Sequence, residues 1–165
     1  MAAIDRPKRD ILDQAIGIYR DSMREFLVRR LKQAPGLTLE KAVEDALSVR
    51  RNTGRLNAFR SHLNRGGEVR GFIDVGDFPG LIGRHWDSVF SEAFKDDRQN
   101  VRLHCEFAAS GRHREAHPDT GDIGAEEARA YLYHITLRSS STIRSNAWNG
   151  WTVTLIKIGL KYLTA

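Results

Sequence analysis

Apolar residues recur at three- and four-residue intervals over much of the chain, which is the spacing of an amphipathic α-helix. Over residues 8–33 this spacing is continuous, until Pro35-Gly36 interrupts it. The predicted buried face of this helix consists of Leu12, Ile16, Tyr19, Met23, Phe26 and Leu27. The pattern therefore predicts one long helix near the start of the sequence.

Two further helices are predicted in the middle of the chain. Thr38 is a suitable N-cap for the first, and its helical propensity extends to about residue 62. The apolar face predicted there is Leu39, Ala42, Val43, Ala46, Leu47 and Val49. The next helix covers residues 77–94, with Asp77 as N-cap and Pro79 in the first turn, where the missing N–H of proline costs little. The buried face predicted for this helix is Leu81, Ile82, Trp86, Val89, Phe90 and Phe94.

A turn at residues 119–122 separates the last two predicted helices. One runs from about Arg98 to Ala116, after Asp96-Asp97, and the other runs from Glu126 to Leu137. Their candidate core residues are Val101, Leu103, Phe107 and Ala108 in the first and Ala128, Tyr131, Leu132 and Ile135 in the second. Residues 1–138 are thus predicted to form an all-α domain, an antiparallel bundle of about five helices.

Residues 139–165 form a C-terminal extension with a different pattern. The segment "WTVTLIKIGLKYL" fits a strand by its β-branched residues and a helix by its apolar spacing, so the period alone does not decide. Because no second convincing strand exists to pair with it, a helix is favoured.

Composition narrows the class of protein. No apolar stretch of signal-peptide or membrane-spanning type occurs, so we expect a soluble cytoplasmic protein with no membrane association. The single cysteine, Cys105, excludes an internal disulfide and a zinc site built on several thiolates.

The basic balance suggests a polyanionic partner. The net charge is +5 and the pI is about 9.7, with arginine dominating the excess. Six arginines follow one another with Glu68 as the one opposing acidic residue between them: Arg50, Arg51, Arg55, Arg60, Arg65 and Arg70. This run fits either a solvated helix face or a surface that follows phosphates.

The stretch "RHREAH", residues 112–117, allows four interpretations. The first is a solvated basic helix end that the helix dipole favours, and the second is a metal site that uses His113 and His117 at i,i+4 spacing. The third is a phosphate anchor formed by Arg112 and Arg114, and the fourth is an acid–base site that acts on RNA. For the metal site no third ligand is signalled beyond the distant His104 or an aspartate.

The acid–base interpretation follows from the proline after His117. A residue that precedes proline is pushed out of the α region, so His117 is expected at the helix C-cap, where carbonyl groups favour its protonated form. A histidine that titrates near pH 7 suits general acid–base catalysis. Arg112, a little over one turn earlier, would place a permanent cation near the same phosphodiester.

The segment from Arg112 to Pro118 resembles the arginine–histidine signature of the HEPN superfamily. "AIGIYRDSMREFLVRRLK", "DVGDFPGLIGRHWDSVFSEAF" and "GAEEARAYLYHI" are also similar to HEPN domains fused to nucleases and phage-defence ATPases. The resemblance covers about residues 8–138. It implies a helical bundle that dimerises so that two such motifs face each other.

The resemblance further implies a metal-independent endoribonuclease that needs no cofactor. Arg112 would polarise the scissile phosphate, His117 would assist attack by the ribose 2′-hydroxyl, and His113 would help to orient the pair. A toxin or defence setting is implied, with an antitoxin or a defence ATPase as partner. The remaining RNA contacts are predicted at Arg114, Arg50, Arg51, Arg55 and Arg60.

Two alternatives stay open on the sequence alone. One is a catalytically inactive HEPN module that binds RNA or assembles with a larger ATPase or nuclease. The other is a plain helical interaction domain with no nucleic-acid role, which would show no salt-dependent RNA binding.

Overall fold

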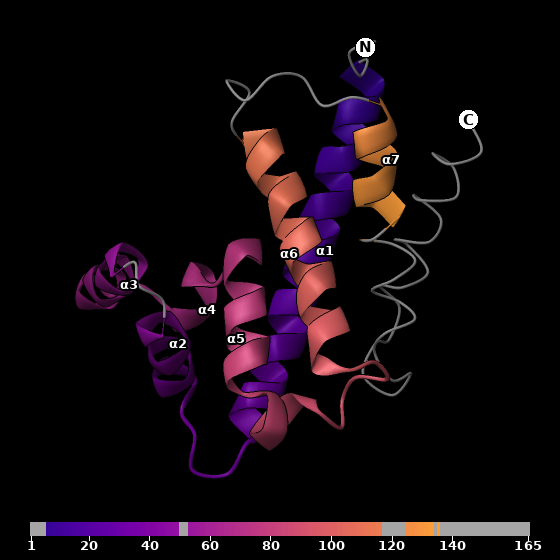
Figure 1. The fold of residues 1–165 in the computed structure, drawn as a ribbon. Coiled ribbons are helices and arrows are strands. Elements are labelled where there is room, and N and C mark those ends of the chain that lie inside the picture. Colours follow the sequence, from indigo (N-terminus) through magenta and orange to yellow (C-terminus); the bar gives the residue numbers. More distant parts are fainter. Residues whose placement is uncertain (1–5, 50–52, 117–124, 134, 136–165) are drawn as a thin grey trace.

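The chain folds into packed helices (Figure 1). The structure is a computed structural model that describes residues 6–49, 53–116, 125–133 and 135. Within these ranges the regular elements are α1 (Arg6–Gln33), α2 (Leu39–Ser48), α3 (Gly54–Asn64), α4 (Val69–Phe72), η1 (Val75–Asp77), α5 (Phe78–Arg84), η2 (Trp86–Phe90), α6 (Arg98–Ala116) and α7 (Ala125–Tyr133). The predicted all-α class is confirmed, and the C-terminal extension at residues 139–165 lies outside the described residues.

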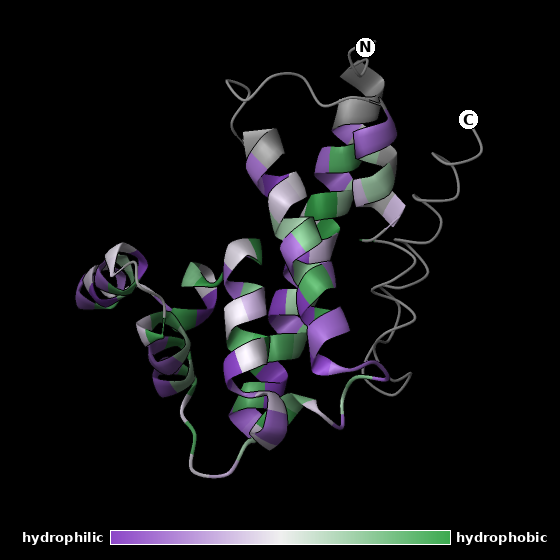
Figure 2. Cartoon of the chain, viewed as in Figure 1, coloured by the Kyte–Doolittle hydropathy of each residue, from purple (hydrophilic) through white to green (hydrophobic). Residues whose placement is uncertain are grey.

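Helix α1 is the longest element, and the other layers of the fold pack on it. Its predicted buried face is confirmed, because each of the six apolar residues is at most 3% exposed. Helices α2, α5, α6 and α7 and the turn η2 all contact α1. In Figure 2 the apolar positions gather where α1, α5 and α6 face one another.

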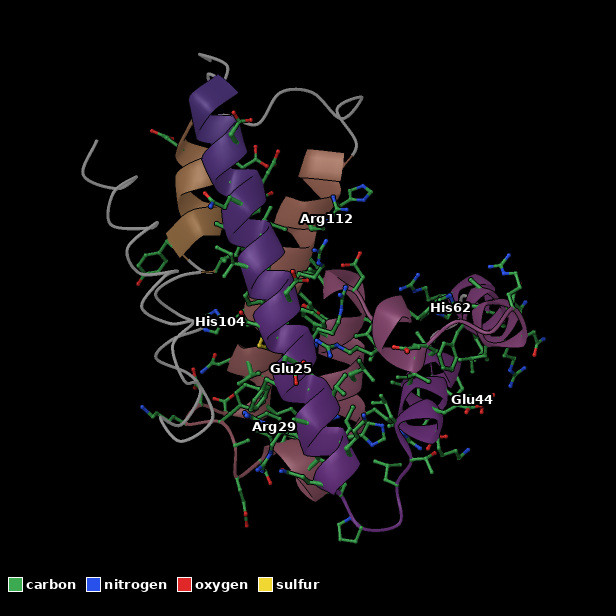
Figure 3. The ribbon with its side chains drawn as sticks, turned by 180° about the vertical axis from the view of Figure 1, so that it is seen from behind. Glu25, Arg29, Glu44, His62, His104 and Arg112 are labelled. Atoms are coloured by element: carbon green, nitrogen blue, oxygen red, sulfur yellow. The ribbon has the colours of Figure 1, made fainter. Side chains whose placement is uncertain are left out.

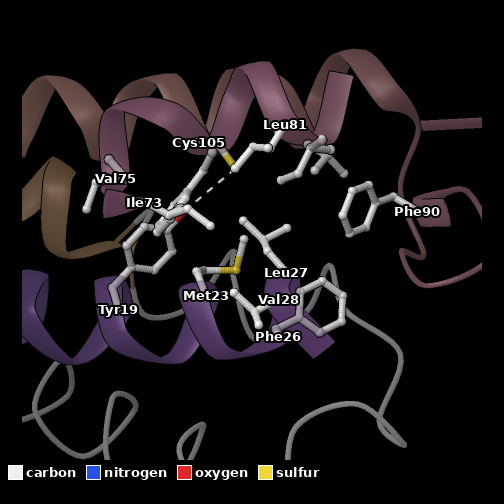
Figure 4. Close-up of a cluster of buried hydrophobic side chains, with 14 of the residues drawn as sticks. Tyr19, Met23, Phe26, Leu27, Val28, Ile73, Val75, Leu81, Phe90 and Cys105 are labelled. Atoms are coloured by element: carbon white, nitrogen blue, oxygen red, sulfur yellow. Dashed lines mark hydrogen bonds between the residues drawn. The ribbon is translucent and has the colours of Figure 1, made fainter. Parts of the chain in front are cut away.

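Helix α6 lies along α1, and one side of it packs against α1 and α5. The hydroxyl of Tyr19 on α1 donates a hydrogen bond to the Cys105 sulfur on α6, with 3.7 Å between oxygen and sulfur (Figure 4). The predicted start of α6 is confirmed, since the Asp97 carboxylate accepts the Asn100 N–H at 2.9 Å as an N-cap does. One predicted core residue is wrong: Leu103 is 51% exposed, and Cys105, which we had not selected, is buried.

Helices α2, α3 and α4 form a separate lobe beside α5 (Figure 1). Thr38 caps α2 as predicted, because its hydroxyl accepts the Lys41 N–H at 3.2 Å. The expected continuous helix up to residue 62 is wrong: α2 and α3 are two helices, and Val49 at the end of α2 is 67% exposed. Helix α3 ends at Asn64, and the chain then turns at Gly66, whose φ of +79° is favourable for glycine and unfavourable for most other residues.

The helix predicted over residues 77–94 is also divided, so the expected number of about five helices is too low. Helix α5 ends at Arg84 and is followed by His85, whose buried ring nitrogen Nε2 lies 2.9 Å from the Ala42 carbonyl oxygen on α2. The next turn is π-helical, closed by a hydrogen bond from Ser91 N–H to the Trp86 carbonyl at 2.8 Å. This wider turn still buries Phe90 in the predicted face, while Trp86 stays half-buried.

None of the helices in the described ranges carries an apolar stretch long enough to cross a membrane.

The buried Cys105 thiol provides a test of the packing between α1 and α6. Burial raises the pKa of this thiol from an ordinary 9.0 to about 12. The unfolded chain loses the thiol proton above about pH 9, whereas the folded chain keeps it, so stability is full below pH 9 and falls between pH 9 and 12. We expect native protein to react with a disulfide reagent at pH 8 far more slowly than unfolded protein.

The control for this prediction is Cys105→Ala, in which the fall of the unfolding free energy between pH 9 and 11 becomes shallower. Rapid labelling of the native protein at low denaturant would contradict the buried position.

Candidate nucleic-acid interface

The end of α6 carries the described part of the arginine–histidine motif. Helix α6 spans Arg98–Ala116 without a break, as predicted, and places Arg112 and His113 in its last turns (Figure 3). The Arg112 side chain is partly buried and His113 is exposed. His117 and the side chain of Arg114 lie outside the described part of the chain, so the predicted meeting of Arg112 and His117 stays a prediction.

Gly111 fixes the position of this last stretch of α6. It is buried, and a Cβ atom added there would lie 3.0 Å from the ring of Tyr131 on α7. The Tyr131 ring is itself held by Phe107, with 5.1 Å between ring centroids, and its hydroxyl donates to Glu127 at 2.8 Å. The small residue before Arg112 therefore allows α7 to approach α6 closely, which outweighs its weak helix propensity.

The described residues provide no third ligand for the metal site that was considered at His113 and His117. Nine residues turn an α-helix by about 180°, so His104 and His113 lie on opposite sides of α6. Among the residues that the structure describes, no three histidine, cysteine or acidic side chains gather in a way that could hold a metal ion.

Arg55, one of the predicted RNA contacts, forms a clamp with the buried Asp77, and its own side chain is 37% exposed. Its guanidinium donates to the carboxylate of Asp77 at 3.1 and 2.5 Å and to the Phe72 carbonyl at 2.9 Å. It also lies over the Phe72 ring, 3.9 Å from the centroid. Asp77 is 4% exposed and occupies the N-cap position of α5 as predicted, but its carboxylate binds Arg55 and the Asp74 N–H instead of capping α5.

Other arginines of the run also have carboxylate partners that are distant in the sequence. Arg60 contacts Glu44 on α2 at 2.5 Å, and Arg70 contacts Glu25 on α1 at 2.7 Å. Figure 3 shows Glu44 on the lobe and Glu25 on α1. In the folded chain, acidic residues from outside the run thus also oppose it, while Arg50 and Arg51 lie outside the described residues.

A different group of arginines was missed by sequence reasoning. Arg84 on α5 and Arg98 and Arg102 on α6 line one cleft together with residues of α2. The i,i+4 spacing of Arg98 and Arg102 was a signal that they share a side of α6. No sequence pattern linked Arg84 to them, because packing of α5 on α6 brings it there.

Comparison with known proteins leaves the class of this protein open. No family model matches the chain, and neither a curated protein nor a solved structure is significantly similar to it. The function therefore has to be argued from the residues and their geometry.

The clamp of Arg55 and Asp77 makes a prediction about stability. Arg55→Gln and Asp77→Asn should each lower the free energy of unfolding by about 2 kcal/mol, because each leaves a polar partner without its charge-assisted hydrogen bonds. The double variant should lose little more than either single variant, since the two residues act on one interaction. Urea unfolding of the three variants measures this coupling.

Arg60→Gln is the matched control for the clamp, since its pair with Glu44 is exposed and should contribute less than about 1 kcal/mol. An Arg55→Gln protein of unchanged stability and weakened RNA binding would instead assign Arg55 to RNA.

The close approach of α7 to Gly111 leads to a second prediction about stability. The same glycine-to-alanine substitution should have opposite effects on the unfolding free energy at Gly111 and at Gly17. Gly111→Ala should lower the unfolding free energy by about 1 kcal/mol, because overpacking against the restrained Tyr131 ring exceeds the gain in helix propensity. Gly17→Ala in α1, where an added Cβ meets nothing within 4 Å, should raise it by about 1 kcal/mol. If thermal unfolding showed that both substitutions stabilise the protein equally, α7 would be able to move away from α6 without loss of stability, and the prediction would be wrong.

Proposed function

We propose that the chain is a metal-independent endoribonuclease of the HEPN type that works as a homodimer in a toxin or phage-defence setting. The single observation that supports this function is the anchoring of Arg112. Its helix is continuous through the motif and is held by the contact of Gly111 with Tyr131 directly before the arginine. An arginine whose backbone is held in place near a helix end suits a reaction in which charge develops on a phosphate.

In the proposed reaction Arg112 binds a non-bridging oxygen of the scissile phosphate and stabilises the charge that develops there. His117 takes the proton from the ribose 2′-hydroxyl, whose oxygen attacks the phosphorus, and the bond to the 5′-oxygen breaks. The leaving 5′-oxygen takes up a proton, which gives a 2′,3′-cyclic phosphate and a 5′-hydroxyl. His113 orients the pair. The substrate hydroxyl is the nucleophile, so the scheme requires no activated water.

The direct test is incubation of the full chain with RNA in EDTA. We expect cleavage that chelation leaves unchanged and that His117→Ala reduces by about 10²- to 10⁴-fold, the usual contribution of a general acid–base group. Arg112→Ala should reduce it by about 10²- to 10³-fold through lost charge stabilisation. The products are identified by their 2′,3′-cyclic phosphate ends in mass spectrometry.

Arg20→Ala is a suitable control, because Arg20 lies on α1 and pairs with the adjacent Asp21 at 2.9 Å. Intact RNA at high protein concentration would refute the nuclease. Saturable RNA binding without product, insensitive to His117→Ala, would identify the alternative, an inactive HEPN module that binds RNA or assembles with an ATPase.

A further inference from the structure

A cleft of about 430 Å³ lies between α2, α5 and α6. It is lined by Ala46, Val49, Pro79, Gly80, Gly83, Arg84, Arg98, Arg102 and Glu106. A second hollow of about 320 Å³ lies next to it on α6, lined by Arg98, Gln99, Arg102 and Leu103. Arg98 and Arg102 border both hollows, so one arginine pair separates two adjoining depressions of the surface.

The lining of the larger cleft is cationic. It contains three guanidinium groups and one carboxylate, that of Glu106. Glu106 pairs with Arg102 at 2.8 Å, and Arg98 donates to the Gly83 carbonyl at 2.7 Å. Because a guanidinium has five N–H donors, these single contacts leave donors on both arginines for a ligand.

The nearby carboxylates of α2 and of the start of α6 have their own partners. On α2, the Asp45 carboxylate pairs with Lys41 at 2.9 Å. The hydrogen bond from Lys41 is the main cause of the lowered pKa of Asp45, and Arg84 and His85 add smaller electrostatic contributions. Asp96 and Asp97 both accept hydrogen bonds from Asn100 at the start of α6.

The two hollows also hold exposed apolar side chains. Val49, 67% exposed, lines the larger one, and Leu103, 51% exposed, lines the smaller one. Apolar side chains beside arginines fit a ligand that offers a charged phosphate and an apolar base face together. A simple inorganic anion would gain nothing from these two residues.

The arginine pair and the motif are on the same helix. Arg102 and Arg112 are ten residues apart, about 15 Å along the axis of α6. At about 100° per residue, Arg112 is turned by about 40° from Arg98 and about 80° from Arg102, so the three arginines leave α6 within one arc. The buried Cys105 lies in the same arc between them, so a strand bound at the cleft does not follow this side of α6 to Arg112.

We propose that Arg84, Arg98 and Arg102 form a second phosphate-binding site that holds a single RNA strand across the two hollows, with bases against Val49 and Leu103. This proposal depends on the proposed function in one respect: the RNA strand bound at the cleft is taken to be the substrate of the arginine–histidine motif.

The test uses a fluorescent RNA with 2′-O-methyl groups, which cannot be cleaved through a 2′-hydroxyl, and measures binding by anisotropy in EDTA. The double variant of Arg84→Gln and Arg102→Gln should raise Kd at least tenfold and lower the salt slope by about 1.4, the loss of two phosphate contacts with a single strand. Glu106→Gln should lower Kd several-fold, because it removes the one carboxylate of the lining.

Two further variants distinguish an effect of the cleft itself from an effect of net charge or of folding. Gly83→Leu adds bulk at a position where a Cβ meets nothing within 4 Å, so it should block the cleft and raise Kd with the charge unchanged. Arg20→Gln, which removes one positive charge away from the cleft, should leave Kd within about twofold. Equal Kd values for the double variant and Arg20→Gln, or no effect of Glu106→Gln and Gly83→Leu, would overturn the proposal.

Two comparisons identify the ligand and separate this proposal from the nuclease. Displacement of the RNA by inorganic phosphate or a mononucleotide as effectively as by unlabelled RNA would assign the cleft to a small phosphate ester and reject the strand. If the protein cleaves ordinary RNA but the cleft variants bind RNA as the unaltered protein does, the proposal for the cleft is rejected and the nuclease proposal stands. Arginine-dependent binding without cleavage would reject the nuclease alone.

Discussion

The packing of one side of α6 against α1 and α5 is the constraint on which the rest of the structure depends. Tyr19 and Cys105 meet in the centre of this contact, with Val101 and Ala108 buried on either side along α6. Close packing of this kind resists displacement, because a shift of α6 would open cavities along its whole buried side. One rigid helix thus carries both the cleft near its start and the arginine–histidine motif near its end.

A second constraint decides which arginines are engaged in holding the fold. The Arg55–Asp77 clamp ties α3 to the start of α5 and fixes the lobe of α2, α3 and α4 beside the main body. Asp77 is nearly inaccessible to water, so its charge requires a cation, and Arg55 provides one together with a bond to the Phe72 carbonyl. Arg55 therefore adds to the net charge while its hydrogen bonds hold the fold, so the number of basic residues does not by itself identify a binding surface.

The proposals for the motif and the cleft share one physical idea. RNA has regularly spaced phosphates, and cationic side chains at regular positions on one helix can contact several of them. On α6 the arginines at positions 98 and 102 lie one turn apart beside the cleft, and the packing of their helix fixes the positions of their backbone. Binding at the cleft would position the strand, and the motif would act on one phosphate of it. The two roles call for different chemistry, since positioning needs charge alone and cleavage needs a proton acceptor.

The sequence by itself determined the all-α class, the extents of α1 and α6, the caps at Thr38 and Asp97, and most of the buried faces. These features depend on local propensity and on helical period, which short stretches of sequence encode. It could not determine the division of the two middle helices, the exposure of Val49 and Leu103, or the partners of Arg55 and Arg60. Those features depend on which residues distant in the chain come into contact. The cleft of Arg84, Arg98 and Arg102 was likewise decided by tertiary structure alone, because a binding surface built from three helices exists only after the helices have packed.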